Sequence, residues 1–133
     1  MAETALSDVP LFAGLSEESL ALVAAGGVTD VPAGQVLAQA GDVGEGMFVV
    51  LDGAVVVERG ALHLDIGRGD FFGDLALLVP DSPRIARVRA KSDAQVLAVP
   101  RDTFDRLLET EPSFARAMLR EMAARLVQAR TGH

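Results

Sequence analysis

Residues 71–88 read FFGDLALLVPDSPRIARV, and this stretch decides how the rest of the chain is interpreted. Gly73 permits a tight turn and lets the backbone approach a ligand closely. The leucine-rich residues 75–78 predict a single helical turn, whose free N–H groups favour a bound phosphate. A loop stiffened by prolines then returns the chain to Arg84, whose guanidinium can grip two phosphate oxygens at once. Together these features predict an anion-binding turn.

Asp74 supplies the second part of this predicted site. An ionised carboxylate only accepts hydrogen bonds, so Asp74 suits a hydroxyl donor rather than the phosphate. A site for an anion beside a site for a hydroxyl donor fits a cyclic ribose phosphate, which carries both groups. Taken alone the motif is weak, because a Gly-Asp turn before leucines is usually a capped core helix. A lone arginine after a loop is, likewise, usually a surface charge.

The residues around this stretch predict a β-barrel. Residues 28–99 are rich in glycine, and short valine- and leucine-rich runs separate the glycines. Many short strands between turn signals are typical of an antiparallel sandwich or barrel. Asp52-Gly53 lies between two apolar runs and strongly favours a hairpin, while Arg59-Gly60 favours one more weakly.

Helices are predicted on both sides of the barrel. Residues 7–26 form a helical entry in which Ser16 can cap a helix N-terminus. Residues 101–130 form two helices, with Asp102 as the cap of the first and Pro112 at the start of the second. The last helix has an apolar stripe, most simply a packing face, and a charged opposite face. The stripe is Phe114, Met118, Met122 and Leu126, and the charged face is Arg116, Arg120, Glu121, Arg125 and Arg130.

Composition restricts the classes of function. The 133 residues fit one domain, residues 1–133, and 50% of them are hydrophobic, which is enough for a buried core. A net charge of -7 argues against nucleic-acid binding. The chain has no cysteine, no secretory signal and no stretch near the ~20 apolar residues of a membrane helix. These features predict a cytoplasmic domain without membrane contact.

Catalytic and metal sites are not predicted. The chain has two histidines, His63 and the terminal His133, whereas a metal-binding cupin barrel needs several histidines that converge inside it. A Gly-x-Ser-x-Gly elbow is absent, and no cysteine can act as a nucleophile. We therefore expect no enzyme activity, no metal ligand and no cofactor.

Residues 71–88 resemble the phosphate-binding cassette of the cyclic nucleotide-binding domain family. The family pattern is Phe-Gly-Glu, an apolar turn ending in leucine, a short loop, and an arginine followed by a small residue and alanine. The spacing from Gly73 to Arg84 matches that of protein kinase A regulatory subunits. Residues 40–50 with Asp52-Gly53 resemble the strand pair that precedes the cassette, and both helical zones match as well. The resemblance implies a mainly β fold, an antiparallel β jelly-roll barrel with an N-terminal helical segment and two C-terminal helices.

The resemblance also implies a ligand site. Arg84 would pair with the cyclic phosphate, while Gly73 and Asp74 would face the ribose 2′-hydroxyl. Backbone N–H groups at positions 75, 76 and 86 would help to hold the phosphate, and strand residues around Val49 would help to line the base and sugar. The implied ligand-binding residues are Phe72, Gly73, Asp74, Leu75, Ala76, Arg84, Ile85, Ala86 and Val88.

The sequence departs from the family pattern within the cassette. Asp74 replaces a glutamate and is one methylene shorter, so its hydrogen bond to the ribose would be longer or bridged by water. Ile85 stands where many members carry Ser, Thr or Ala, and it offers no hydroxyl to a guanine amino group, which favours cAMP over cGMP. Arg87 occupies a position that is usually small and polar, and it either adds positive potential or, as we favour, points to solvent.

The function implied is that of a regulatory domain that binds cAMP, with cGMP less favoured. Ligand binding would move the C-terminal helices, with residues 113–130 as the lid over the base. The partners would be the cyclic nucleotide and an effector protein or domain that the sequence does not identify, and a homodimer through the final helix remains open. The alternative is an interaction module that kept the fold and lost the ligand. Asp74 and Ile85 favour that alternative, while Gly73 and Arg84 at the family spacing oppose it.

Overall fold

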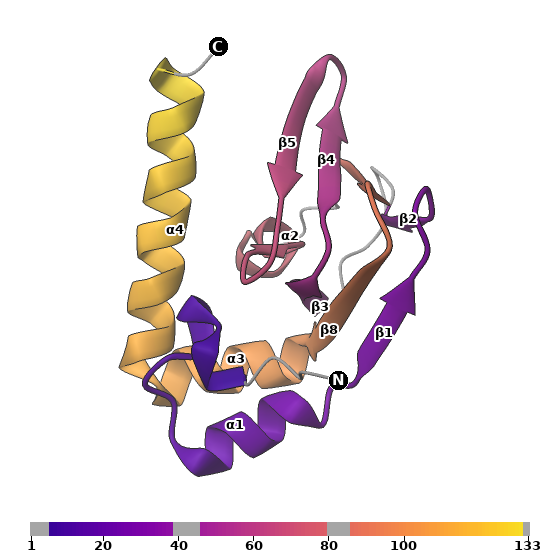
Figure 1. Cartoon of the computed structure of the whole chain (residues 1–133). Helices are drawn as coiled ribbons and strands as arrows, with labels where there is room; N and C mark the ends of the chain where they lie inside the picture. The colour runs from indigo at the N-terminus through magenta and orange to yellow at the C-terminus, as the bar shows by residue number, and fades with distance from the viewer. Residues whose placement is uncertain (1–5, 39–45, 80–85, 132–133) are drawn as a thin grey trace.

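The structure, a computed structural model, describes residues 6–38, 46–79 and 86–131, which form two antiparallel sheets flanked by helices (Figure 1). The first sheet has the strand order β1-β8-β3-β6, and the second has the order β2-β7-β4-β5. The strands of the first sheet are β1 (Val28–Val31), β8 (Ala94–Pro100), β3 (Gly46–Asp52) and β6 (Phe71–Phe72). Those of the second are β2 (Val36–Ala38), β7 (Arg87–Ala90), β4 (Val55–Arg59) and β5 (Leu62–Ile66). The predicted fold class is confirmed.

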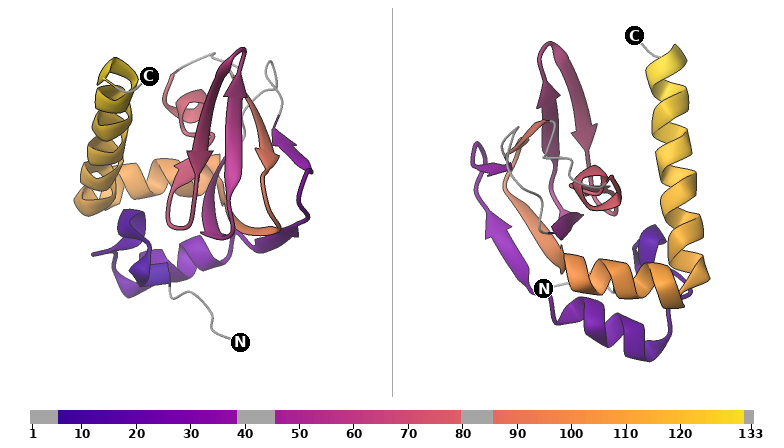
Figure 2. Two further views of the ribbon diagram at one scale, coloured as in Figure 1. Left: turned by 45° about the horizontal axis from the view of Figure 1, so that its top comes forward. Right: turned by 180° about the vertical axis from the view of Figure 1, so that it is seen from behind.

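The helices gather at one end and along one side of the barrel. They are η1 (Leu6–Asp8), η2 (Pro10–Phe12), α1 (Glu17–Ala24), α2 (Leu75–Leu78), α3 (Arg101–Thr110) and α4 (Pro112–Thr131). The right-hand view of Figure 2 shows α1 and α3 side by side below the sheets, while α4 rises from the end of α3 and runs alongside the barrel. The turn α2 lies on the side of the barrel that faces α4 in these views.

Buried apolar side chains form two clusters on opposite faces of the first sheet. The helix-side core lies between that sheet and the helices and contains Val9, Leu11, Phe12, Leu15, Val23, Met47, Val49, Leu51, Phe71, Leu77, Leu97, Val99, Phe104, Leu107, Phe114 and Met118. The barrel core lies between the two sheets and contains Val31, Val50, Val55, Ile66, Phe72, Val88, Ala90 and Val96. Side chains alternate along a strand, so β3 serves both clusters, which explains why its sequence is continuously apolar.

The strong hairpin signal at Asp52-Gly53 was misleading. Strand β3 before it and strand β4 after it belong to different sheets, so the turn carries the chain from one sheet to the other. Gly53 has a φ of 77°, and a Cβ atom there would lie 2.2 Å from the carbonyl oxygen of Asp93. The glycine is therefore needed for a positive φ and a close backbone approach. The weaker signal at Arg59-Gly60 does join a hairpin, that of β4 and β5.

The predicted helix caps were half right. Ser16 is the N-cap of α1, and its hydroxyl accepts a hydrogen bond from the Ser19 N–H at 3.2 Å. Asp102 is not a cap, because α3 begins at Arg101 with Pro100 in the cap position. Asp102 lies within the first turn instead, where its negative charge suits the helix dipole.

The apolar stripe of α4 is a packing face only over its first turns. Phe114 and Met118 are buried in the helix-side core, and Met122 packs against that core while partly exposed. Leu126, the last member of the stripe, is 62% exposed. The packing interpretation is therefore confirmed near the start of the helix and wrong near its end.

Candidate functional site

The described part of the cassette spans both sheets, and its Phe72 and Val88 meet in the barrel core. Phe72, Gly73, Asp74 and the turn α2 follow one another from β6, at the edge of the first sheet. Ala86 precedes β7 and Val88 lies in it, within the second sheet. Arg84 and Ile85 lie outside the described residues, so their predicted roles stay predictions.

The turn at the start of the cassette has the geometry that the sequence predicts. Gly73 has a φ of 90°, a conformation that costs glycine little and other residues more. The carbonyl oxygen of Asp74 accepts hydrogen bonds from the N–H groups of Leu77 and Leu78, both at 3.0 Å, which closes the helical turn α2. Leu77 is buried in the helix-side core and anchors the turn. The turn is thus held in place by the packing of Leu77 and by the backbone conformation of Gly73.

Asp74 is a buried carboxylate beside this turn. The residue is only 4% exposed, and burial raises the pKa of its carboxyl, while the Arg125 guanidinium acts to lower it. Its Oδ1 atom lies 3.8 Å from Nη1 of Arg125. A backbone hydrogen bond also acts to lower the pKa of the Asp74 carboxyl. A carboxylate here can accept a hydrogen bond from a hydroxyl donor.

Arg125 is the residue that the sequence analysis misplaced. We assigned it to the outward, charged face of the last helix, but its side chain is only 21% exposed and turns toward the cassette. Its Nη2 atom donates to Asp70 Oδ1 at 2.7 Å and to the Phe71 carbonyl oxygen at 2.5 Å. The guanidinium carbon also lies 4.4 Å from the centre of the Phe71 ring. Helical spacing could have revealed this, because Arg125 follows buried Met118 by two turns of helix.

The barrel core offers an apolar surface next to the turn. Phe72 is buried and stacks on Phe48, with ring centroids 5.2 Å apart. Val88 is buried in the same core, and Phe48, Leu37 and Val57 pack against it while remaining partly exposed. Val49 itself belongs to the helix-side core, so its neighbours Phe48 and Val50 face the barrel instead. Partly exposed apolar side chains of this kind suit a flat base and a sugar.

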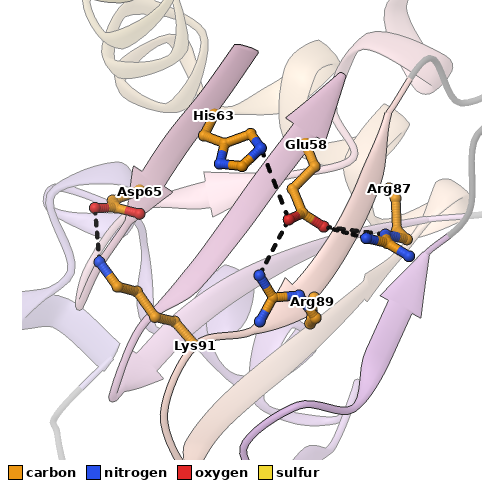
Figure 3. A network of polar contacts seen from close by, with 6 residues as sticks. All are labelled: Glu58, His63, Asp65, Arg87, Arg89 and Lys91. Carbon is orange, nitrogen blue, oxygen red and sulfur yellow. Dashed lines mark hydrogen bonds and ion pairs between the residues drawn. The ribbon is translucent and has the colours of Figure 1, made fainter. Parts of the chain in front are cut away.

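Arg87 turns away from the barrel interior. It is 48% exposed on the outer face of the second sheet, where its guanidinium lies 2.9 Å from Glu58 Oε1 (Figure 3). This agrees with the solvent-facing interpretation, with the addition of an ion pair that the sequence did not reveal. Alternation along β7 explains the direction, because Val88 beside it points inward.

The described residues include neither a metal-binding cluster nor a membrane-spanning helix. Within them, no group of three or more His, Cys, Asp and Glu side chains is arranged to hold a metal ion. Nor does this part of the chain contain a helix with the length and apolar character to cross a membrane. His63 is exposed, with Nε2 3.9 Å from Glu58 Oε2.

Comparison with known proteins adds relatives to this geometry. Residues 28–111 match the family described as cyclic nucleotide-binding domain. An uncharacterized NTE family protein of Mycobacterium tuberculosis (strain ATCC 25618 / H37Rv) is 36% identical over 132 residues, which are 97% of this chain and 22% of that protein. The cAMP-dependent protein kinase regulatory subunit of Emericella nidulans is 37% identical over 112 residues, 81% of this chain and 27% of the subunit. This chain therefore spans about a quarter of the length of these curated relatives.

A solved structure shares the fold over nearly the whole chain. It is described as cAMP bound PfPKA-R (141-441), and it superposes with a TM-score of 0.79 at 26% sequence identity. The match covers 96% of this chain and 45% of the other. The likeness extends beyond the barrel to the flanking helices, since a match of that extent includes most of α1 and α4.

Proposed function

The chain belongs to the cyclic nucleotide-binding domain family, and we propose that it is a regulatory domain that binds cAMP and couples binding to movement of its C-terminal helices. The family is one of regulatory ligand-binding domains rather than of enzymes. We propose further that residues 1–133 form one such domain, that it acts in the cytoplasm, and that it controls an effector protein or domain. The lack of cysteine is compatible with a reducing compartment.

The observation that carries the proposal is the buried carboxylate of Asp74 on a turn opened by a positive-φ glycine. Burial of a carboxylate is costly, and here a backbone hydrogen bond and the Arg125 guanidinium, 3.8 Å away, compensate for part of the cost. A ribose hydroxyl that donates to Asp74 would offset part of that cost. In the proposed complex the phosphate would lie against the N–H groups of Leu75, Ala76 and Ala86, with Arg84 as its cationic partner.

The apolar lining suits a purine base but does not distinguish adenine from guanine. The described side chains beside the turn, Phe48, Phe72 and Val88, offer stacking and apolar contact rather than base-edge hydrogen bonds. The preference for cAMP over cGMP therefore depends on Ile85, which has no hydroxyl for a guanine amino group. Both nucleotides belong in the same titration.

Calorimetry with cAMP and with cGMP tests ligand binding. Arg84→Ala removes the proposed phosphate partner and should cost roughly 1.5–3 kcal/mol of binding free energy, because hydrogen bonds to charged groups are worth about that much. Arg116→Ala, which removes an equal charge from the exposed side of α4, is the matched control and should leave the affinity unchanged. Equal binding by wild type and Arg84→Ala would show that the site is misassigned. Absence of heat with either nucleotide at millimolar concentration would favour the interaction module.

The coupling to α4 needs a separate measurement. The chain has no cysteine, so two introduced cysteines are the sole labelling sites for a pair of spin labels. Leu62 on β5 and Val127 on α4 are both well exposed and suit Leu62→Cys and Val127→Cys. We expect cAMP to change the distance distribution between the labels, and Arg84→Ala to abolish that change. If the distance distribution is the same with and without bound cAMP, ligand binding does not move the helix and the proposed coupling is wrong.

A further inference from the structure

One carboxylate on the outer face of the second sheet is shared by two arginines (Figure 3). Glu58 Oε1 accepts from Arg87 Nε at 3.0 Å, and Glu58 Oε2 accepts from Arg89 Nη2 at 3.0 Å. The Glu58 side chain is 12% exposed, less than either arginine. The two guanidiniums lower the pKa of the Glu58 carboxyl, so it is ionised at neutral pH. A carboxylate gripped from two sides has little freedom to move.

This cluster lies directly behind the ligand side of strand β7. Arg87 and Arg89 point outward, while Val88 and Ala90 point inward and are buried in the barrel core. Val88 is one of the residues expected to line the ligand. The strand also begins three residues after Arg84, a length of chain that spans about 10 Å at most. A shift of the start of β7 would therefore move Val88 and its neighbour Ala86.

Strand β7 pairs more regularly with β4, the strand that carries Glu58, than with β2. Four successive residues of β7 pair with β4, with Glu58 opposite Arg87 and Val56 opposite Arg89. On its other edge β7 pairs with β2, and there the register shifts between Val36 and Ala38. The position of β7 is thus set mainly from β4, the strand that carries Glu58.

We propose that Glu58 is a positioning residue for nucleotide binding, which holds the first residues of β7 in place through Arg87 and Arg89. The inference rests on the proposed function. Without the carboxylate, two like charges at alternate positions of β7 would repel each other with no anion between them. The start of the strand would then loosen behind Val88 and next to Ala86.

The test compares two neutralised carboxylates on the same face of the sheet. Glu58→Gln should raise the Kd for cAMP about three- to tenfold, the range expected within a shared ion-pair network. Asp65→Asn is the matched control, because Asp65 pairs with Lys91 at 2.9 Å on the same face but contacts neither arginine of the Glu58 cluster. It should change the Kd less than twofold, within the range of most surface substitutions. Calorimetry at a temperature where every variant is folded provides the Kd values.

The sign of the effect distinguishes positioning from simple electrostatics. Removing a negative charge near an anion site favours the anion by charge alone, so weaker binding by Glu58→Gln must come from displaced groups. Amide hydrogen exchange across residues 86–89 should accelerate in Glu58→Gln and not in Asp65→Asn. Glu58→Asp, which retains the charge, should restore part of the affinity. Combining Glu58→Gln with Arg87→Gln should weaken binding no more than the stronger single change, because both remove the same contact.

The outcomes separate this inference from the proposed function. If wild type binds cAMP and Glu58→Gln binds equally well, the positioning role is wrong and the proposed function stands. A raised Kd with unchanged amide exchange would also overturn the positioning role. If wild type binds neither nucleotide, the proposed function fails, and the role of Glu58 fails with it.

Discussion

The two halves of α4 are held to the molecule in different ways. Near its start, Phe114 and Met118 are buried, and Phe114 packs edge-to-face on Phe104 with ring centroids 5.8 Å apart. Near its end, Leu126 and Val127 are 62% and 58% exposed. There a long polar side chain, Arg125, donates hydrogen bonds to Asp70 and to the Phe71 carbonyl oxygen at the start of the cassette.

The difference between the two halves indicates which part of α4 can move. Apolar packing at the start of α4 is strong and is lost only when the core opens, because each buried aromatic removes a large area from water. A guanidinium that bonds to Asp70 and a carbonyl oxygen exchanges more easily, since water can replace those partners. A helix with a fixed start and an exchangeable end suits a lid that responds to a ligand.

The largest effect should come from the start of the helix. Phe114→Ala removes a fully buried ring from the helix-side core and should lower the free energy of unfolding by about 3–5 kcal/mol. Urea denaturation followed by circular dichroism measures this. Leu119→Ala on the exposed side of the same helix is the control, and it should change stability by about 0.5 kcal/mol or less. A similar loss in both variants would mean that the buried face of α4 does not anchor the start of the helix.

Removal of the polar contact should have a smaller and more local effect. Arg125→Gln deletes the charge-assisted bonds to Asp70 and Phe71 and should cost about 1.5 kcal/mol, at the low end for hydrogen bonds of charged groups. Amide exchange should accelerate over residues 121–131 and remain slow around Met118. Arg120→Gln, at an exposed position, is the control. Uniform acceleration along the whole helix would contradict a fixed start with an exchangeable end.

The sequence predicted the architecture well because its signals were periodic and local. Glycine-separated apolar runs indicated the barrel, and the stop at Pro112 indicated two closing helices, both as observed. Partners across the molecule were harder to predict. The turn at Asp52-Gly53 has the residues of a hairpin, but the same residues also suit a crossing between sheets, and the pairing of β3 and β4 with other strands distinguishes the two.

The candidate site was predicted in part for the same reason. Gly73, Asp74 and the helical turn are adjacent in sequence, so local chemistry was enough to propose them together. Arg125 reaches Asp70 across 55 residues of chain, and its charge led us to place it in solvent. The charge of Arg125 suggested the solvent-facing side of α4, whereas its helical spacing from Met118 suggested the buried side. The structure agrees with the spacing.

The smallest effect should appear in the pH dependence of stability. Glu111 lies next to the start of α4 and Asp74 lies near its end, and the pKa values of their carboxyls are shifted in opposite directions. At the start, Glu111 accepts hydrogen bonds from Ser16 and Ser19, and these lower the pKa of its carboxyl from 4.5. Its contribution is therefore complete above about pH 4.5 and is lost as the pH falls through the lowered pKa. At the other end, burial raises the pKa of Asp74 from 3.8, so its ionised form costs stability at neutral pH and protonation relieves that cost.

Two isosteric variants test this difference in sign. At pH 7, Glu111→Gln should unfold at a lower temperature than wild type, while Asp74→Asn should unfold at a temperature higher by roughly 3 °C, as expected for a change below about 1 kcal/mol. The Asp74→Asn difference should shrink first, as the pH falls through the raised pKa of Asp74 toward 3.8. The Glu111→Gln difference should begin to shrink below about pH 4.5 and disappear only once the pH has passed the lowered pKa of Glu111. Thermal melts between pH 3.5 and pH 7 measure the trend, with Asp65→Asn as a surface control. A lower melting temperature for Asp74→Asn at pH 7 would show that Asp74 is stabilised by Arg125 more than burial costs it, and the distal half of α4 would then be anchored as firmly as the start.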